Sequence, residues 1–302
     1  RAGLQSTVQD QGRFGYAHLG VSASGAADNF ALRIGNILVG NPKYSAGVEM
    51  TIIGDKYRFK SDTYIALTGS EFEAELDNKP ISFWQGQRIK KEQILDIRST
   101  KTGARCYLCV TGGIIVEDVM GSKTTHLISG IGGFHGRILK KLDELHFGPL
   151  DNSIKPVQKV NDSIITDTKI IKVTKGIQWP WFNKNQKNKF FHHSYQVTDL
   201  SNRMGLRLIG NAINTKKENE ITTAGIPLGA IQIPGDGQPI ISFVEHQTTG
   251  GYPIIANVIS ADVRKVGQLK AGDYFQFELI SFSSAEKLKV DQEKFIHNLN
   301  HD

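Results

Sequence analysis

The order of apolar and polar residues predicts one helix near the start of the chain. Apolar side chains recur there at helical spacing: Phe30, Ala31, Ile34, Ile37 and Leu38. This spacing places them on one face of a helix. Ser24 or Asp28 is available as an N-cap, and Gly40-Asn41-Pro42 follows as a stop signal. We therefore predict a helix over residues 28–40.

From residue 48 onward the pattern changes to short strands bounded by Gly, Asp, Asn or Pro. The segments with this pattern are 48–53, 56–60, 64–68, 71–76, 87–89, 94–97, 106–111, 169–174 and 195–198. Short strands at such regular spacing are typical of a barrel or a sandwich. The predicted fold class is mainly β, with a few short helices.

The chain is long enough for two domains, since 302 residues exceed the usual size of one. Residues 151–168 are polar and aperiodic and are interpreted as a linker. The predicted organisation is a first β domain over 1–150, a second over 169–282, and a charged helical tail over 283–302.

Two segments of the second half resemble segments of the first half. Residues 201–211 resemble residues 26–36, and residues 266–277 resemble residues 136–147. Both matches are weak in identity. Together they favour two related β domains, with a ligand cleft between them.

Composition excludes several classes of function. The net charge of +6 comes from short, separate groups of lysines, and no basic face interleaved with aromatic residues is present, so we expect no nucleic-acid partner. No run of eighteen apolar residues predicts a membrane helix, and the first residues lack the apolar core of a signal peptide. The expected location is cytoplasmic, with no membrane partner.

The two cysteines, Cys106 and Cys109, lie in an apolar run of strand type. Residues three apart on a strand point to opposite faces, so their sulfurs should not meet. A zinc site would also need a second ligand pair at suitable spacing. We predict two buried, reduced thiols and no metal site.

Three glycine-rich stretches carry the candidate chemistry. The first, residues 7–28, places acids, an Arg and a His among glycines before a helix, which suits an anion or carbonyl site or, alternatively, a set of tight turns. The second, residues 121–137, lacks the Gly and Lys spacing of a Walker loop, so it is either a turn cluster or a substrate loop. The third, residues 247–251, combines side-chain donors with backbone N–H groups and suits an oxyanion or carboxylate.

These stretches resemble the allophanate hydrolase subunit 2 family, which includes KipA and the C subunit of 5-oxoprolinase and is related to biotin-dependent carboxyltransferases. The resemblance rests on Val8-Gln9-Asp10-Gln11-Gly12-Arg13, Ser24-Gly25-Ala26, Gly121-Ser122-Lys123-Thr124-Thr125-His126, Gly132-Gly133-Phe134, Ser201-Asn202-Arg203-Met204-Gly205, Gln247-Thr248-Thr249-Gly250-Gly251-Tyr252-Pro253 and Ile259-Ser260-Ala261-Asp262. It implies two cyclophilin-like β-barrel domains facing a cleft. One wall would be residues 9–28, opposite the loop 247–253.

Membership of this family implies a component of ATP-dependent 5-oxoprolinase, an enzyme that opens the 5-oxoproline lactam to L-glutamate and is active only as a complex. The implied partners are a KipI-like B subunit together with a LamB-type A subunit. The implied cofactor is ATP with Mg²⁺. The absence of a phosphate-loop motif leaves three places for its site: an unconventional site in this chain, one shared with a partner, or one elsewhere.

Two alternatives remain open. One is a regulatory KipA-like protein that acts on a KipI-like kinase inhibitor. The other is a carboxyltransferase component that acts on urea or allophanate with a separate biotin carrier. We do not expect biotin on this chain, because Met50, Met120 and Met204 are followed by Thr, Gly and Gly rather than by the Lys that carries biotin.

The candidate site residues are the polar members of the shared motifs. Arg13, Arg203 and Lys123 are candidates for binding a substrate carboxylate or a phosphate. Asp10, Asp28 and His126 are candidate acids or bases, and the predicted oxyanion donors are Gln247, Thr248 and Gly250. The remaining substrate-binding candidates are Gln9, Ser24, Thr125 and Tyr252. For each of them a turn-fixing or capping role is the alternative.

Overall fold

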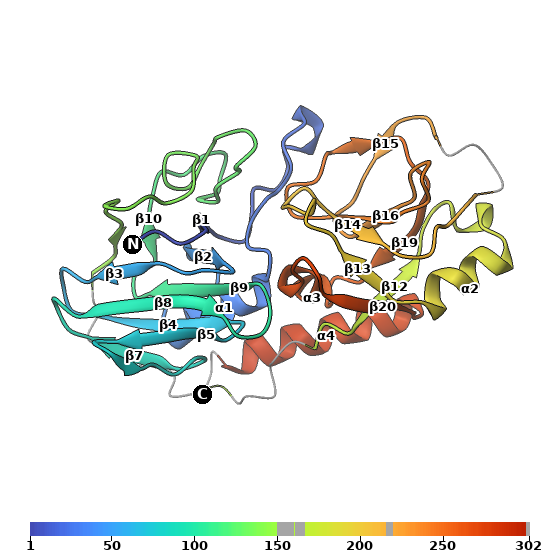
Figure 1. Cartoon of the computed structure of the whole chain (residues 1–302). Helices are drawn as coiled ribbons and strands as arrows, with labels where there is room; N and C mark the ends of the chain where they lie inside the picture. The colour runs from blue at the N-terminus through green and yellow to red at the C-terminus, as the bar shows by residue number, and fades with distance from the viewer. Residues whose placement is uncertain (150–159, 161–166, 216–219, 300–302) are drawn as a thin grey trace. The chain divides into compact units, whose positions relative to one another are not determined.

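The computed structural model describes residues 1–149, 160, 167–215 and 220–299, and these residues form two compact units. Unit 1 consists of Arg1–Arg13, Ser24–Thr166 and Phe295–Asp302, and unit 2 of Phe14–Ala23 and Asp167–Lys294. The elements of both are labelled in Figure 1. The predicted linker lies outside the described residues except for three positions. One of them, Val160, is buried in unit 1 and donates its N–H to the carbonyl of Trp84.

Unit 1 is built on two open β-sheets. The first has the order β1-β2-β9-β4-β7, formed by β1 (Gln5–Gln9), β2 (Gly47–Thr51), β9 (Arg105–Val110), β4 (Thr63–Gly69) and β7 (Gly86–Ile89). The second has the order β3-β8-β5-β6, formed by β3 (Lys56–Arg58), β8 (Ile94–Thr100), β5 (Phe72–Leu76) and β6 (Lys79–Pro80). A short pair, β10 (Ile114–Ile115) and β11 (His146–Phe147), completes the unit. Each strand predicted for this half is present.

The central strand β9 serves two cores, one on each face. Cys106 packs in the cluster formed by residues of both sheets, whereas Cys109 packs in the cluster that contains the helix. The prediction that the two thiols point to opposite faces is confirmed, and both are buried and reduced. Burial raises the pKa of each thiol, which keeps them unreactive.

The predicted helix is α1 (Asn29–Leu38), which is labelled in Figure 1. Its apolar side chains pack in the second of these cores. Asp28 is its N-cap and accepts a hydrogen bond from the N–H of Ala31 at 3.0 Å. After Leu38 the chain turns at Gly40 in the left-handed region, as the stop signal predicted.

Unit 2 is a closed barrel with the strand order β12-β19-β16-β17-β14-β13-β20. Its strands are β12 (Ile170–Lys175), β13 (Tyr195–Val197), β14 (Gly205–Ile209), β16 (Ala230–Gln232), β17 (Ile240–Ser242), β19 (Ile254–Val258) and β20 (Tyr274–Leu279). A two-stranded pair, β15 (Ala224–Gly225) and β18 (Thr249–Gly250), stands apart from it. Stacked rings of Phe190 and Phe277, 4.6 Å apart, help to fill the interior.

The helices assigned to unit 2 are short, except for the last. They are the 3-10 turns η1 (Ala17–Leu19) and η3 (Trp179–Trp181), and the α-helices α2 (Lys184–His192), α3 (Val263–Gln268) and α4 (Phe282–Leu299). The predicted helical tail is α4. Its last residues belong to unit 1, where Ile296 is buried beside α1.

Two sequence predictions need correction. Among the described residues, the barrel predicted for each half is found in unit 2, whereas the two sheets described for unit 1 do not close into a ring. The match between residues 26–36 and 201–211 is not structural. The first segment forms α1, whereas in the second the Asn202 side chain accepts from the N–H of Met204, and strand β14 follows.

The other internal match is a shared turn. In unit 1 the Asp143 carboxylate accepts from the N–H of Lys140 at 2.7 Å, and in unit 2 Asp273 accepts from the N–H of Lys270 at 3.0 Å. The residue before each Asp has a positive φ: Leu142 at 74° and Gly272 at 91°. This turn supports the predicted relationship between the two halves.

Candidate functional site

In unit 1 five of the predicted site residues form one buried polar network: Gln9, Asp10, Arg13, Ser24 and Thr125. Asp10 joins two loops within it. Its carboxylate accepts hydrogen bonds from the N–H of Gly12 at 2.9 Å, the hydroxyl of Ser122 at 2.7 Å and the N–H of Lys123 at 2.6 Å. Hydrogen bonds to a carboxylate are stronger than those between neutral groups. Asp10 therefore ties the end of β1 to the loop 119–126.

Arg13 holds the same loop from the other side. Its side chain is 1 % exposed and donates to the carbonyls of Val119 at 2.8 Å and Thr124 at 3.0 Å. A guanidinium used in this way fixes the backbone of residues 119–124. The contacts match the turn-fixing alternative for Arg13 more closely than a substrate clamp.

Gln9, Ser24 and Thr125 extend this network along β1. The carbonyl of Thr125 accepts from the side chains of Gln9 at 3.2 Å and Ser24 at 3.0 Å, while its hydroxyl donates to the carbonyl of Val8 at 2.9 Å. The hydroxyl of Thr124 donates to the side chain of Gln9. These short polar side chains replace the ladder bonds that an irregular segment lacks.

The remaining predicted residues of unit 1 have different surroundings. Asp28 caps α1, and its N–H donates to the hydroxyl of Tyr107 at 2.7 Å. The ring of His126 accepts at Nδ1 from the N–H of Ser129 at 3.1 Å. Lys123 is half-buried, and its ammonium makes no hydrogen bond or ion pair with any residue that the structure describes. Lys123 is thus the cation of this set that is available to a substrate.

A cavity of about 600 Å³ adjoins this network and is lined by the glycine-rich loop 130–136. Gly133 packs so closely on Thr125 that a Cβ there would come within 1.8 Å of the threonine hydroxyl. The backbone N–H groups of four loop residues make no hydrogen bond within the described structure: Gly132, Gly133, Phe134 and His135. Successive N–H groups on left-handed backbone are suited to an anion such as a carboxylate.

In unit 2 Arg203 and Glu245 form a buried ion pair. Nε of Arg203 lies 2.5 Å from Oε1 of Glu245, with both side chains at most 4 % exposed. The N–H of Glu245 donates to the carbonyl of Arg203 at 2.8 Å. Arg203 therefore binds a carboxylate, as its type predicted, but this carboxylate belongs to the protein. The pair anchors the start of the loop 245–253.

The loop itself is accessible. Gln247 and Tyr252 are exposed, and Thr248 and Gly250 are half-buried. The carbonyl of Thr248 accepts from the N–H of Ile226 at 3.0 Å, and Gly250 pairs with Ala224 in the β15–β18 hairpin. The backbone is therefore fixed while the side chains of Gln247 and Thr248 are left to contact a ligand.

The structure adds His246, which the sequence analysis did not select. Its Nδ1 lies 2.7 Å from the carbonyl oxygen of Gln247. Because a carbonyl only accepts, Nδ1 carries the proton and Nε2 is left as an acceptor. Burial lowers the pKa of His246, partly opposed by this hydrogen bond, so the ring is neutral at pH 7. In the sequence, its only signal was its position between Glu245 and the predicted donor Gln247.

The network lies in unit 1 and the loop 245–253 in unit 2, so the predicted cleft between residues 9–28 and 247–253 stays a prediction. Within the described residues, no three His, Cys, Asp or Glu side chains are grouped as they would be around a metal ion. The helices in that part of the chain are too short or too polar to cross a bilayer.

Comparison with known proteins identifies relatives over nearly the whole chain. A family model described as carboxyltransferase domain, subdomain A and B, matches residues 19–279. The C subunit of the 5-oxoprolinase of Escherichia coli is 38% identical over 301 residues, covering 99% of this chain and 96% of the relative. The C subunit of the Haemophilus influenzae enzyme is 34% identical over 296 residues, covering 98% and 94%.

A solved structure shows the same fold within a larger protein. The crystal structure of the urea amidolyase of K. lactis superposes with a TM-score of 0.93 at 32% identity. The match covers 99% of this chain but 19% of the amidolyase chain.

Proposed function

This chain belongs to the family of carboxyltransferase domains with subdomains A and B, and because it is also a homologue of 5-oxoprolinase C subunits, we propose that it is the C subunit of an ATP-dependent 5-oxoprolinase. Its reaction would be the opening of the 5-oxoproline lactam to L-glutamate in the cytoplasm. Its partners would be a LamB-type A subunit together with a KipI-like B subunit. The observation that carries the proposal is the length of the match, which covers 96% and 94% of the two bacterial relatives.

Opening a lactam by water needs three things from a protein: an anchor for the substrate, a base for the water and a donor for the oxygen that becomes negative. We assign the substrate carboxylate to the free N–H groups of the loop 130–136, and we keep Lys123, which does not line that cavity, as a second candidate. We assign the base to Nε2 of His246, and the oxyanion donors to Gln247 and Thr248.

The buried network has a supporting role in this proposal. Asp10 and Arg13 hold the loop 119–126, on which Lys123 is carried, and Thr125 supports the loop 130–136. They act as positioning residues. Arg203, through its ion pair with Glu245, does the same for the loop of His246.

The cavity beside the network does not suit ATP. Its lining includes Glu117 and Glu144 and contains no Lys or Arg to neutralise a triphosphate. We therefore propose that ATP and Mg²⁺ bind at a site formed wholly or largely by a partner protein of the complex.

The test is reconstitution of the three subunits, with glutamate release from 5-oxoproline and ATP hydrolysis as the two readouts. We expect turnover that depends on all three chains and on 5-oxoproline. The test variant is His246→Asn, which should abolish most of the turnover. Its matched control is Lys79→Ala, an exposed substitution in β6 that should leave turnover unchanged. A complex that assembles without 5-oxoproline-dependent turnover would overturn the proposal and favour the regulatory, KipA-like function.

The similarity to urea amidolyase favours a second candidate, a carboxyltransferase component that works with a biotin carrier on another chain. The reconstituted complex distinguishes the two. Transfer of a carboxyl group from a biotinylated carrier to urea, without glutamate release, would support this second function.

A further inference from the structure

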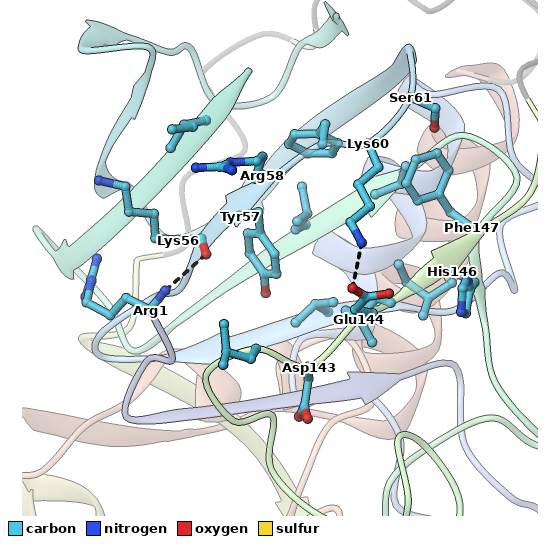
Figure 2. A pocket seen from close by; sticks show the side chains of 18 of the residues that line it. Arg1, Lys56, Tyr57, Arg58, Lys60, Ser61, Asp143, Glu144, His146 and Phe147 are labelled. Carbon is cyan, nitrogen blue, oxygen red and sulfur yellow. Dashed lines mark hydrogen bonds and ion pairs between the residues drawn. The ribbon is translucent and has the colours of Figure 1, made fainter. Parts of the chain in front are cut away.

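Unit 1 contains a second cavity, of about 610 Å³, which the proposed reaction does not use (Figure 2). It is bounded by the strands β2, β3, β8, β9 and β10 and by the segment 141–147. It shares only Glu144 and His146 with the cavity beside the polar network. A volume of this size is typical of a site for a small organic molecule.

The inner wall of this cavity is apolar. Val48, Leu108, Val110 and Ile114 line it, and all four belong to the core cluster shared by the two sheets. The cavity therefore extends into the hydrophobic core from the edge of unit 1. An apolar group inserted there would be removed from water, which is favourable by roughly 25 cal/mol for each Å² of its surface.

The rim carries more cations than its carboxylates neutralise. Figure 2 shows Lys60 reaching Glu144, and their charged atoms are 2.6 Å apart. The other rim carboxylate, Asp143, is held by both terminal nitrogens of Arg137 at 2.6 and 2.9 Å. Two further lining cations, Arg1 and Lys56, pair with Asp96 at 2.7 and 3.3 Å. This leaves Arg58 and Lys141, whose side chains make no ion pair or hydrogen bond with any described residue.

Leu142, on the segment at the rim, is exposed and has a left-handed backbone conformation within the turn held by Asp143. Its side chain is 88% exposed, and its φ of 74° lies in the left-handed region that costs a residue with a Cβ about 1 kcal/mol. In unit 2 the same place in the same turn is occupied by Gly272, without that cost. Leu142 is thus an exposed apolar side chain in the lining of an apolar cavity, where it is available to contact an occupant.

We propose that this cavity binds a small amphipathic anion: a molecule with an aliphatic body and a single carboxylate. The body would lie against Leu108, Val110 and Ile114. The carboxylate would pair with Arg58 and Lys141, and Leu142 would cover the body at the rim. This site is separate from the one proposed for 5-oxoproline, which is a small polar ring with no aliphatic chain to fill the inner wall.

The test uses octanoate as the probe and isothermal titration calorimetry on the full chain. We expect saturable binding of one octanoate. Octylammonium, with the opposite charge, and acetate, without the aliphatic body, should not bind. Arg58→Ala combined with Lys141→Ala should weaken octanoate binding by at least about tenfold, the loss of a charge-assisted contact. The matched control is Lys79→Ala combined with Lys91→Ala, which removes two exposed charges outside the cavity and should leave binding unchanged.

Leu142→Gly provides a second variant that relieves backbone strain and so should fold; it should also weaken binding severalfold. Equal binding of octanoate and octylammonium, no binding of octanoate, or unchanged binding in the Arg58 and Lys141 double variant would each overturn the proposal. Protection of the cavity residues from hydrogen exchange by the partner proteins, but not by octanoate, would assign the cavity to a protein segment and overturn it as well. None of these outcomes depends on 5-oxoproline turnover.

Discussion

Arg13 in unit 1 and Arg203 in unit 2 are both arginines in glycine-containing loops, and both are almost fully buried. Arg13 donates to two backbone carbonyls and belongs to a network whose other predicted side chains, Gln9, Asp10, Ser24 and Thr125, are buried as well. Arg203 is bound to one carboxylate, and the predicted residues that follow it in the chain, from Gln247 to Tyr252, are exposed or half-buried.

The difference shows that an arginine in a glycine-containing loop can have two structural roles: to bind backbone carbonyls or to pair with a carboxylate. In unit 1 most of the charged and hydroxyl side chains hold the loops in place, while Lys123 and the N–H groups of the glycine-rich loop are left for a ligand. In unit 2 a single ion pair fixes the loop, and the side chains are left for a ligand. Substitutions should therefore affect stability in the first set and turnover in the second, with the ion pair as the exception.

The largest effect is expected for Arg203→Met. It leaves the buried carboxylate of Glu245 without its partner, which should lower the unfolding free energy of unit 2 by about 3–5 kcal/mol. Hydrogen exchange of the barrel strands, measured by mass spectrometry, reports on this unit separately. The double variant Arg203→Met with Glu245→Met should recover much of the loss. If it does not, the side chains matter for more than their pairing.

Gln247→Ala tests the exposed side of the comparison. The stability should change by less than about 0.5 kcal/mol, because the side chain is exposed. The kcat of the reconstituted complex should fall by about 10²-fold, the usual effect of removing an oxyanion donor and equal to about 2.7 kcal/mol. Normal kcat would remove Gln247 from the proposed mechanism.

Asp10→Asn tests the buried side. The amide cannot accept all three hydrogen bonds of the carboxylate, so unit 1 should lose about 2 kcal/mol of unfolding free energy, measured by urea denaturation. Turnover should fall only to the extent that the loop 119–126 loses its fixed conformation. Full stability with abolished turnover would show instead that Asp10 acts as a catalytic acid or base.

The shared turn allows a matched pair of substitutions. Leu142→Gly in unit 1 should stabilise the fold by up to about 1 kcal/mol, and Gly272→Ala in unit 2 should destabilise it by a similar amount. No atom lies within 4 Å of the position a Cβ would take at Gly272, so the backbone angle is the only cost there. Thermal unfolding of both variants measures the pair. Opposite signs are expected, and equal signs would contradict the shared turn.

The smallest effect concerns pH. The pKa of His246 is lowered from its ordinary value of 6.5, so below pH 6.5 the unfolded chain binds a proton that the folded chain resists. Stability should therefore fall as pH drops through this window. Comparison with His246→Asn isolates the contribution, because the other histidines are common to both proteins. The parent chain should show the steeper loss between pH 6.5 and 5, and parallel curves would place His246 in an unperturbed setting.

The sequence predicted most of unit 1 because its signals are local. Alternation located the strands, and the Asp28 cap with apolar residues at helical spacing located α1. The spacing of Cys106 and Cys109 predicted two different cores. Closure of the sheets was not predictable in this way, since it depends on which strand edges meet. That information lies in pairs such as β12 with β20, more than a hundred residues apart.

The sequence identified which residues gather in the glycine-rich loops, but it did not predict the roles of several of them. The acids and arginines of the glycine-rich loops were selected as ligand-binding groups, yet Asp10, Arg13 and Arg203 are engaged by the protein's own loops. Some of their partners are backbone groups, such as the carbonyl of Val119, and every residue has such a group, so the sequence does not reveal the contact. Helix α2 was missed because it is rich in Lys and Asn and has no apolar residues at helical spacing. Its one buried aromatic side chain is Phe190.

The chain passes between the two units four times, after Arg13, Ala23, Thr166 and Lys294. Neither unit is therefore formed by one continuous segment of the sequence. A cut within residues 151–168 would leave residues 14–23 on the wrong fragment, and it would also separate Ile296 from the core around α1. Each fragment expressed alone should therefore be insoluble, and expression of both together should be needed to recover the fold.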